Sequence, residues 1–372
     1  MIVLKIEDIQ QICKGIADAV DSSQLSVLTE ALELKVQDQV LYLAVTNREY
    51  YVRVRLNVQK GNVFHATVNA SLFLKLISQI TTETIELDVQ DNYLVIKGNG
   101  VYKLPLIYDG DQPLSLPAIP VNNATAHFYI KRDILTSILT FNSKELQKGF
   151  ITHPVQKLYY MDEKGAITFT SGACVNSFTL EQPVKILLDS KLVKLFKLFK
   201  EENVLFTLGH EAASNDQIQS RVSFATPTVE INAILNSEEK LINAIPVNVI
   251  REKASTLYPY TATFNKHALT QAINRLALFK NSDKVYNKFE FEKDCVTIYD
   301  SEGNNKETIC YNNTNSGMEE REVYTTYLDF ADLRAALDTC SEAHITLNFG
   351  DNAAMTIIRG NICNIIPEAR MD

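Results

Sequence analysis

The side chains that most often carry catalysis or bind metal ions are spread thinly along this sequence. Its six histidines form no HExxH or comparable metal-binding pair. Its six cysteines include no CxxC pair and mostly fall in apolar segments, so we expect buried, reduced thiols rather than a zinc site. No phosphate-binding glycine loop occurs, and Ser171 lacks the glycine of a nucleophile elbow two positions before it. The sequence therefore predicts a protein with no catalytic centre, no metal and no cofactor.

A run of four lysines at a spacing of three is the most distinctive chemical pattern. Lys191, Lys194, Lys197 and Lys200 alternate with the apolar residues Leu192, Leu195, Phe196 and Phe199. At about 100° per residue, the apolar residues share one side of a helix and the lysines spread over the other. An ordinary amphipathic helix with a solvated lysine face is one interpretation. No acidic residue falls within 190–200 to pair with them, which favours a phosphate-binding surface.

This helix belongs to a pattern that occurs three times. Residues 64–89, 184–208 and 323–349 each predict a strand, a capping residue, a short helix and a further strand. The predicted caps are Asn69, Asp189 and Asp329, whose side-chain oxygens can accept from free amides of the first turn. A second helix precedes each copy, over residues 7–20, 131–143 and 266–280. The predicted fold is α+β, with antiparallel sheets and two helices in each of three similar tandem domains, 1–120, 121–255 and 256–372. The boundary stretches near 116–123 and 252–256 show neither helical nor strand periodicity.

Positive charge concentrates on the six predicted helices. The whole chain carries a net charge of −9, whereas these helices together carry +6, which leaves −15 for the rest. A shared basic surface on an otherwise acidic protein indicates contact with nucleic-acid phosphates that is independent of sequence and weakened by salt. The predicted DNA-facing residues are Lys14, Lys75, Lys131, Lys191, Lys194, Lys197, Lys200, Arg275 and Arg334.

Local stretches at 41–49, 64–80, 94–104 and 363–370, in this order and spacing, resemble the bacterial-type DNA polymerase III beta subunit family, the beta sliding clamps. The resemblance implies a head-to-tail homodimer that closes a ring around duplex DNA, with helices lining the hole and sheets outside. It implies a subunit interface between Tyr102 and Leu104 of the first domain and Leu278 and Phe279 of the third. For Leu278 and Phe279, burial under their own sheet is the competing interpretation.

The family resemblance also implies a hydrophobic pocket for peptide tails of polymerase, clamp loader and repair proteins. Its expected wall consists of Gln156, Leu158, Thr170, Gly172, Cys174, Val175, Pro246, Ile250, Ile366 and Pro367. The chain departs from the family here, because Ala173-Cys174 stands where a His-Arg pair is usual. Near Pro246, residues 247–250 replace an aromatic residue and arginines. Such divergence fits a clamp encoded by a phage or mobile element.

Length and composition suit this interpretation. The chain has 372 residues, of which 46% are hydrophobic and 22% charged, which is ordinary for a protein with buried cores. No apolar run is long enough for a membrane span, and the N-terminus has no signal-peptide pattern, so we expect a cytoplasmic protein without membrane contact. The alternative to a DNA clamp is a clamp-like scaffold or decoy that binds replication-protein peptides without loading on DNA.

Overall fold

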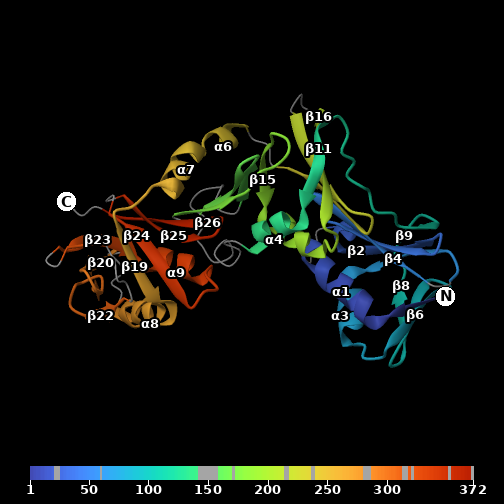
Figure 1. Cartoon of the computed structure of the whole chain (residues 1–372). Coiled ribbons are helices and arrows are strands. Elements are labelled where there is room, and N and C mark those ends of the chain that lie inside the picture. The colour runs from blue at the N-terminus through green and yellow to red at the C-terminus, as the bar shows by residue number, and fades with distance from the viewer. Residues whose placement is uncertain are drawn as a thin grey trace. The chain divides into compact units, whose positions relative to one another are not determined.

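The structure is a computed structural model. It describes residues 1–20, 26–58, 61–140, 158–169, 172–212, 218–235, 239–279, 286–311, 317–319, 322–350 and 353–369. By its internal contacts the chain divides into two compact units. The first comprises Met1–Leu139 and Glu181–Ser237, and the second Thr140–Leu180 and Glu238–Asp372. Each unit contains antiparallel sheets and helices, as the sequence predicts (Figure 1).

The first unit contains an eight-stranded sheet in the order β11-β16-β17-β18-β4-β3-β2-β5 and a four-stranded sheet in the order β1-β6-β7-β8. Its strands are β1 (Ile2–Lys5), β2 (Ala31–Gln37), β3 (Val40–Thr46), β4 (Tyr50–Asn57), β5 (Phe64–Asn69), β6 (Thr84–Gln90), β7 (Tyr93–Lys97), β8 (Val101–Pro105), the short pair β9 (Tyr108–Asp109) and β10 (Gln112–Pro113), β11 (Ala124–Lys131), β15 (Lys185–Asp189), β16 (Asn203–Ala212), β17 (Ile218–Ala225) and β18 (Val229–Ile234). Its helices are α1 (Ile6–Ile16), α2 (Val27–Glu30), α3 (Ala70–Gln79), α4 (Arg132–Thr140) and α5 (Ser190–Lys194), with 3-10 turns η1 (Ala17–Ala19) and η4 (Leu195–Leu198).

The second unit contains the sheet order β12-β13-β14-β26-β25-β24-β19 and a four-stranded sheet in the order β22-β21-β20-β23. Its strands are β12 (Leu158–Asp162), β13 (Gly165–Phe169), β14 (Ala173–Ser177), β19 (Tyr260–Asn265), β20 (Tyr286–Phe291), β21 (Cys295–Tyr299), β22 (Lys306–Cys310), β23 (Tyr324–Asp329), β24 (His344–Phe349), β25 (Ala354–Arg359) and β26 (Ile362–Pro367). Its helices are α6 (Glu239–Asn243), α7 (Val247–Ser255), α8 (Lys266–Leu276) and α9 (Phe330–Asp338), with the 3-10 turn η5 (Ala277–Phe279). One core fills the space between the two sheets and α8 and α9, with Phe264, Phe289 and Phe349 almost fully buried.

The threefold repeat is visible in equivalent hydrogen bonds. The amide of the first residue of α1, Ile6, donates to the carbonyl of Glu83 at 3.0 Å. The first residue of α4, Arg132, donates likewise to Glu202 at 2.8 Å, and Lys266 of α8 donates to Ala343 at 2.9 Å. Each acceptor directly precedes the strand that pairs with the strand before the helix. These antiparallel pairs are β1–β6, β11–β16 and β19–β24.

The predicted capping residues are confirmed. The side chain of Asn69 accepts from the amide of Leu72, that of Asp189 from Lys191, and that of Asp329 from Ala331. Each bond satisfies an amide that a helix start leaves without an internal partner. The lysine-rich helix is shorter than predicted, because α5 ends at Lys194 and continues only as the 3-10 turn η4 to Leu198.

Helix α7 was missed by the sequence analysis, which expected no regular structure near 252–256. None of its residues is fully buried, so its sequence carries little of the apolar periodicity by which helices are recognised.

The two compact units do not follow the predicted domain boundaries. Predicted domain 121–255 is divided between them, since its strand β18 pairs with β4 and its strand β14 pairs with β26. The three-domain boundaries therefore stay a prediction.

Candidate nucleic-acid interface and peptide groove

A deeply buried face lies opposite the four predicted lysines, as expected: Lys191 and Lys194 of α5, Lys197 of η4 and Lys200 just after it. Leu192, Leu195 and Phe196 are at most 2% exposed. The Phe196 ring lies 4.7 Å from that of Phe224, which ties this segment to the sheet beneath it. Lys191, Lys197 and Lys200 are exposed and Lys194 is half-buried, so burial of the apolar face directs these amines outward.

Two of these four lysines have partners within the first unit, on α1 and on the 3-10 turn η1 that follows it. The ammonium of Lys197 lies 2.5 Å from a carboxylate oxygen of Asp18, and that of Lys200 donates to the side chain of Gln11 at 2.8 Å. Gly15 permits this approach, because a Cβ there would come within 2.2 Å of the Leu198 side chain. Among the described residues, no carboxylate forms an ion pair with Lys191 or Lys194. These two amines are therefore the better candidates for contact with an external anion.

The other predicted DNA-facing residues divide into two kinds. Lys14, Lys75 and Lys131 are exposed on or beside α1, α3 and α4. Arg275 on α8 instead donates two hydrogen bonds to Glu307, at 2.8 and 2.6 Å, which largely neutralises its charge. Those bonds raise the pKa of Arg275 and lower that of Glu307.

Arg334 on α9 lies beside a cavity of about 140 Å³ in the second unit. The guanidinium is half-buried, and its Nε has no hydrogen-bond partner among the described residues. The same cavity is lined by Leu276, Asn287, Asp329 and Phe330. Arg334 is therefore less accessible to an external anion than an exposed lysine would be.

The predicted peptide pocket falls on both faces of one sheet. Strand β14 pairs with β26 so that Val175 lies opposite Cys363 and Cys174 opposite Asn364. Because side chains alternate between faces along a strand, Cys174 and Ile366 point toward α9. Leu158, Val175 and Pro367 share the other face, with Leu158 and Val175 buried and Pro367 half-buried.

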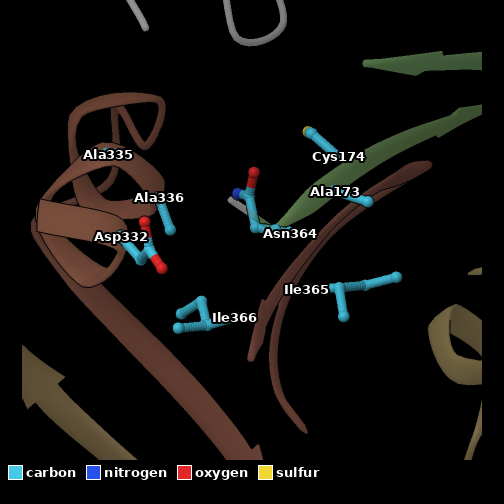
Figure 2. Close-up of a pocket in the computed structure, with 9 residues that line it drawn as sticks. Ala173, Cys174, Asp332, Ala335, Ala336, Asn364, Ile365 and Ile366 are labelled. Carbon is cyan, nitrogen blue, oxygen red and sulfur yellow. The ribbon is translucent and has the colours of Figure 1, made fainter. Parts of the chain in front are cut away.

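The α9 side of this sheet holds a small cavity, with Cys174, Asp332, Asn364 and Ile366 around it (Figure 2). Its volume is about 20 Å³, room for about one water molecule and far too small for a peptide side chain. Burial, with the nearby charge of Asp329, raises the pKa of Asp332 to about 6. A peptide would therefore have to bind on the opposite face, beside α7.

Helix α7 contacts β14 and β26 on the side away from α8 (Figure 1). Ile250 of this helix is half-buried, and Pro246, the residue before the helix begins, is exposed. Gly172 directly precedes β14 and lies against β26. No side chain fits at this position, because a Cβ there would come within 2.2 Å of the Ile365 carbonyl oxygen. Of the remaining predicted pocket residues, Gln156 and Thr170 lie outside the described residues.

Arg251 anchors α7 to the sheet. Its guanidinium donates to both carboxylate oxygens of Asp162 at the end of β12, at 2.8 and 2.5 Å. Tyr160 and the amide of Lys164 donate to the same carboxylate, at 3.1 and 2.9 Å. Burial raises the pKa of Asp162, but the hydrogen bonds from Arg251 and Lys164 outweigh it and hold the pKa below its usual value. This pair could not be predicted from the sequence, because its members are 89 positions apart and belong to no motif.

The predicted subunit-interface residues lie on an exposed 3-10 turn and on a terminal strand. Leu278 and Phe279, in η5, are 81% and 53% exposed, which rules out burial under their own sheet. In the first unit, Tyr102 is half-buried and Leu104 buried on β8, the last strand in its sheet order. Strand β22 is likewise terminal in its sheet in the described part of the second unit. Unpaired backbone groups along such edges are open to pairing with another chain.

The described residues contain no group of three or more His, Cys, Asp or Glu side chains placed to hold a metal ion. Across the same residues, no helix has the length and apolar character needed to cross a membrane.

Comparisons with known proteins agree with this architecture. No protein-family model matches the chain. The beta sliding clamp of Helicobacter pylori strain J99 is 23% identical to it over 219 residues, which are 52% of this chain and 55% of that protein. The chain thus spans about half the length of the curated relative that it matches.

Among solved structures, the DNA polymerase III beta subunit of Thermotoga maritima aligns with 100% of this chain and 99% of its own, with a TM-score of 0.77 and 13% identity. The Helicobacter pylori beta clamp bound to a DNA ligase peptide aligns with 100% of this chain and 99% of its own, with a TM-score of 0.74 and 16% identity. A chain that matches these structures end to end, and repeats the same strand–helix bonds three times, has the DNA sliding clamp fold. Over about half of its sequence and in its whole fold it is similar to the bacterial beta sliding clamps, the beta subunits of DNA polymerase III.

Proposed function

We propose that this protein is a DNA sliding clamp, a ring of chain copies that encircles duplex DNA and tethers replication and repair proteins without catalysing a reaction itself. The observation that carries the proposal is the full-length match to the clamp fold, combined with outward-facing lysines on its repeated helices. A clamp needs contact with phosphates alone, and exposed amines supply such contact at any base sequence. Such a protein acts in the cytoplasm, where the chromosome of a bacterium or the genome of its phage is copied.

The ring would be a head-to-tail homodimer. The exposed pair Leu278 and Phe279, just after α8, would pack against Tyr102 and Leu104 of β8 in the next copy. A pairing of β8 with β22 would close both open sheet edges at once and remove their tendency to aggregate.

Lys191 and Lys194 would contact the DNA backbone directly, whereas Lys197 pairs with Asp18 of η1 and Lys200 bonds to Gln11 of α1. Each phosphate contact contributes about 0.9 to the slope of log K against log salt. We expect the double variant Lys191→Glu/Lys194→Glu to lower that slope by about 2 in equilibrium binding to a fluorescent duplex. A matched control is Lys35→Glu/Lys164→Glu, which changes the net charge equally at exposed positions on β2 and the β12–β13 turn. Equal losses in both variants would refute a specific DNA-facing role for the helix.

The groove between α7 and the β14–β26 sheet would receive apolar peptide tails. Pro367 and Ile250 would line it above the buried Val175, and apolar walls that exclude water are what such a site needs. The Helicobacter pylori structure contains a DNA ligase peptide, which makes that peptide a suitable fluorescent probe. We expect Ile250→Ala to weaken its binding by about tenfold, in keeping with the loss of one buried aliphatic contact. Val249→Ala removes a 56% exposed side chain from the same helix and is expected to leave binding unchanged. Binding that is equally affected by both changes, or by neither, would exclude this groove.

A further inference from the structure

Two cysteines stand directly opposite each other on neighbouring strands of the second unit. Cys295 opens β21 and Cys310 ends β22, and the antiparallel register pairs them. At the next pair along the ladder, the amide of Tyr311 donates to the carbonyl of Asp294 at 3.0 Å. Hydrogen-bonded and non-hydrogen-bonded pairs alternate in an antiparallel ladder, so Cys295 and Cys310 form a non-hydrogen-bonded pair. Their Cα atoms are therefore expected about 4.5 Å apart, within the range that a disulfide spans.

The two thiols also share one face of the sheet. Val296 and Ile298, which alternate with Cys295, are buried in the core, so Cys295 points the other way. On that outer face the next non-hydrogen-bonded pair is Thr297 and Thr308, whose hydroxyl oxygens lie 3.0 Å apart. Side-chain atoms in equivalent positions therefore already meet across these two strands.

Access separates this pair from the rest of the cysteines. Cys310 is exposed and Cys295 partly exposed, whereas Cys13, Cys174, Cys340 and Cys363 are buried. All six thiols are free. An oxidant in solution can thus reach the two opposed thiols, whereas burial shields the other four.

We propose that Cys295 and Cys310 form a reversible cross-strand disulfide, a thiol–disulfide site that responds to small disulfides such as oxidised glutathione. The thiolate of exposed Cys310 attacks the small disulfide, forms a mixed disulfide and releases one small thiolate. The Cys295 thiolate then attacks the sulfur of Cys310, forms the protein disulfide and releases the second small thiolate. The protein loses two protons and two electrons, and the electrons reduce the small disulfide to two thiols.

The second step needs the Cys295 side chain as a thiolate. Burial, with the nearby charge of Glu292, raises the pKa of Cys295 and keeps its thiolate scarce near neutral pH. Below that pKa, each pH unit increases the thiolate fraction about tenfold, and the closing rate should rise with it. The bond would tie down β22, the terminal strand of its sheet, on the face opposite the Arg275–Glu307 pair.

The test uses the full chain, incubated with oxidised glutathione, quenched in acid, then denatured and treated with an alkylating reagent. Mass spectrometry counts the remaining thiols and identifies cross-linked peptides. We expect two of the six thiols to disappear, one peptide pair to join Cys295 to Cys310, and dithiothreitol to restore both. The closing rate is expected to rise about tenfold per pH unit.

Two variants make the outcome decisive. Cys310→Ser should give no intramolecular bond and at most one glutathione on Cys295. In the variant Cys295→Ser/Cys310→Ser/Thr297→Cys/Thr308→Cys, the pair is moved to the next non-hydrogen-bonded position and should close as well, which supports the geometric argument. Unfolding midpoints measured alongside show that each variant is folded. The proposal would be overturned if the wild type, oxidised in its folded state, still had six thiols to alkylate. Glutathione adducts without a cross-link, or a cross-link to a buried cysteine, would overturn it as well.

Discussion

Replacing Arg251 by alanine should destabilise the second unit and release α7 from the sheet. The change leaves Asp162, whose side chain is only 8% exposed, without the two charge-assisted hydrogen bonds that hold its charge. Breaking a buried ion pair from one side costs about 3–5 kcal/mol, whereas an exposed pair contributes about 0–1 kcal/mol. The Arg251 side chain is 22% exposed, and Tyr160 and Lys164 still donate to the carboxylate, so we expect a loss of about 2–3 kcal/mol.

The loss should depend on pH. The pKa of Asp162 is lowered in the folded protein, so the ion pair's contribution is present above the unfolded pKa of about 3.9 and disappears as pH falls through the lower folded pKa. The difference in the free energy of unfolding between wild type and Arg251→Ala should therefore be full at pH 7 and shrink as pH falls below about 3.9.

Urea unfolding followed by circular dichroism measures this effect. We expect a midpoint about 1 M lower for Arg251→Ala, given the usual dependence of stability on urea. Lys97→Ala, which breaks the exposed pair with Glu86, serves as control and should lose less than about 1 kcal/mol. The double variant Arg251→Ala/Asp162→Asn should recover part of the loss, because no buried charge then remains unpaired. A loss below about 1 kcal/mol, or one equally large in strong acid, would refute this account of the anchor.

Two further predictions concern the subunit edge and a half-buried carboxylate. Leu278→Ala/Phe279→Ala should raise the dissociation constant of the dimer by at least about tenfold in sedimentation, with little change in unfolding, because both side chains are exposed. Leu257→Ala, at a 96% exposed leucine, is the control, and equal association in all three proteins would contradict the predicted interface. Asp332→Asn should stabilise the protein by about 1 kcal/mol at pH 7 and hardly at pH 4. The raised folded pKa of about 6 lowers stability as pH rises from about 4 to 6, with an effect reduced by partial exposure. A stability difference that is independent of pH would disprove this assignment.

The features predicted correctly from the sequence are those whose signal is local. Asn69, Asp189 and Asp329 cap helices because a side chain two or three positions away from a free amide is enough to satisfy it. The buried face of α5 follows from residues within one turn of each other. The repeat was detectable because three copies of the same local pattern reinforce one another.

What the sequence left undetermined depends on contacts between distant segments. The pairing of Lys197 with Asp18 joins residues 179 positions apart, so the four lysines look alike in sequence although two of them are engaged. The β14–β26 register places Cys174 and Val175 on opposite faces, and only the paired strand reveals which face adjoins α7. Helix α7 itself is held by Arg251 rather than by an apolar stripe, which periodicity cannot detect.

The central claim is that copies of this chain encircle duplex DNA. The most direct measurement compares retention of the protein on a nicked circular plasmid with retention after the same plasmid is cut once, in salt high enough to weaken phosphate contacts. A closed ring stays on the circle and slides off the linear ends, so the protein should co-elute with the circular DNA and be lost on cutting. Equal retention on both forms, or none on either, would contradict a topological link.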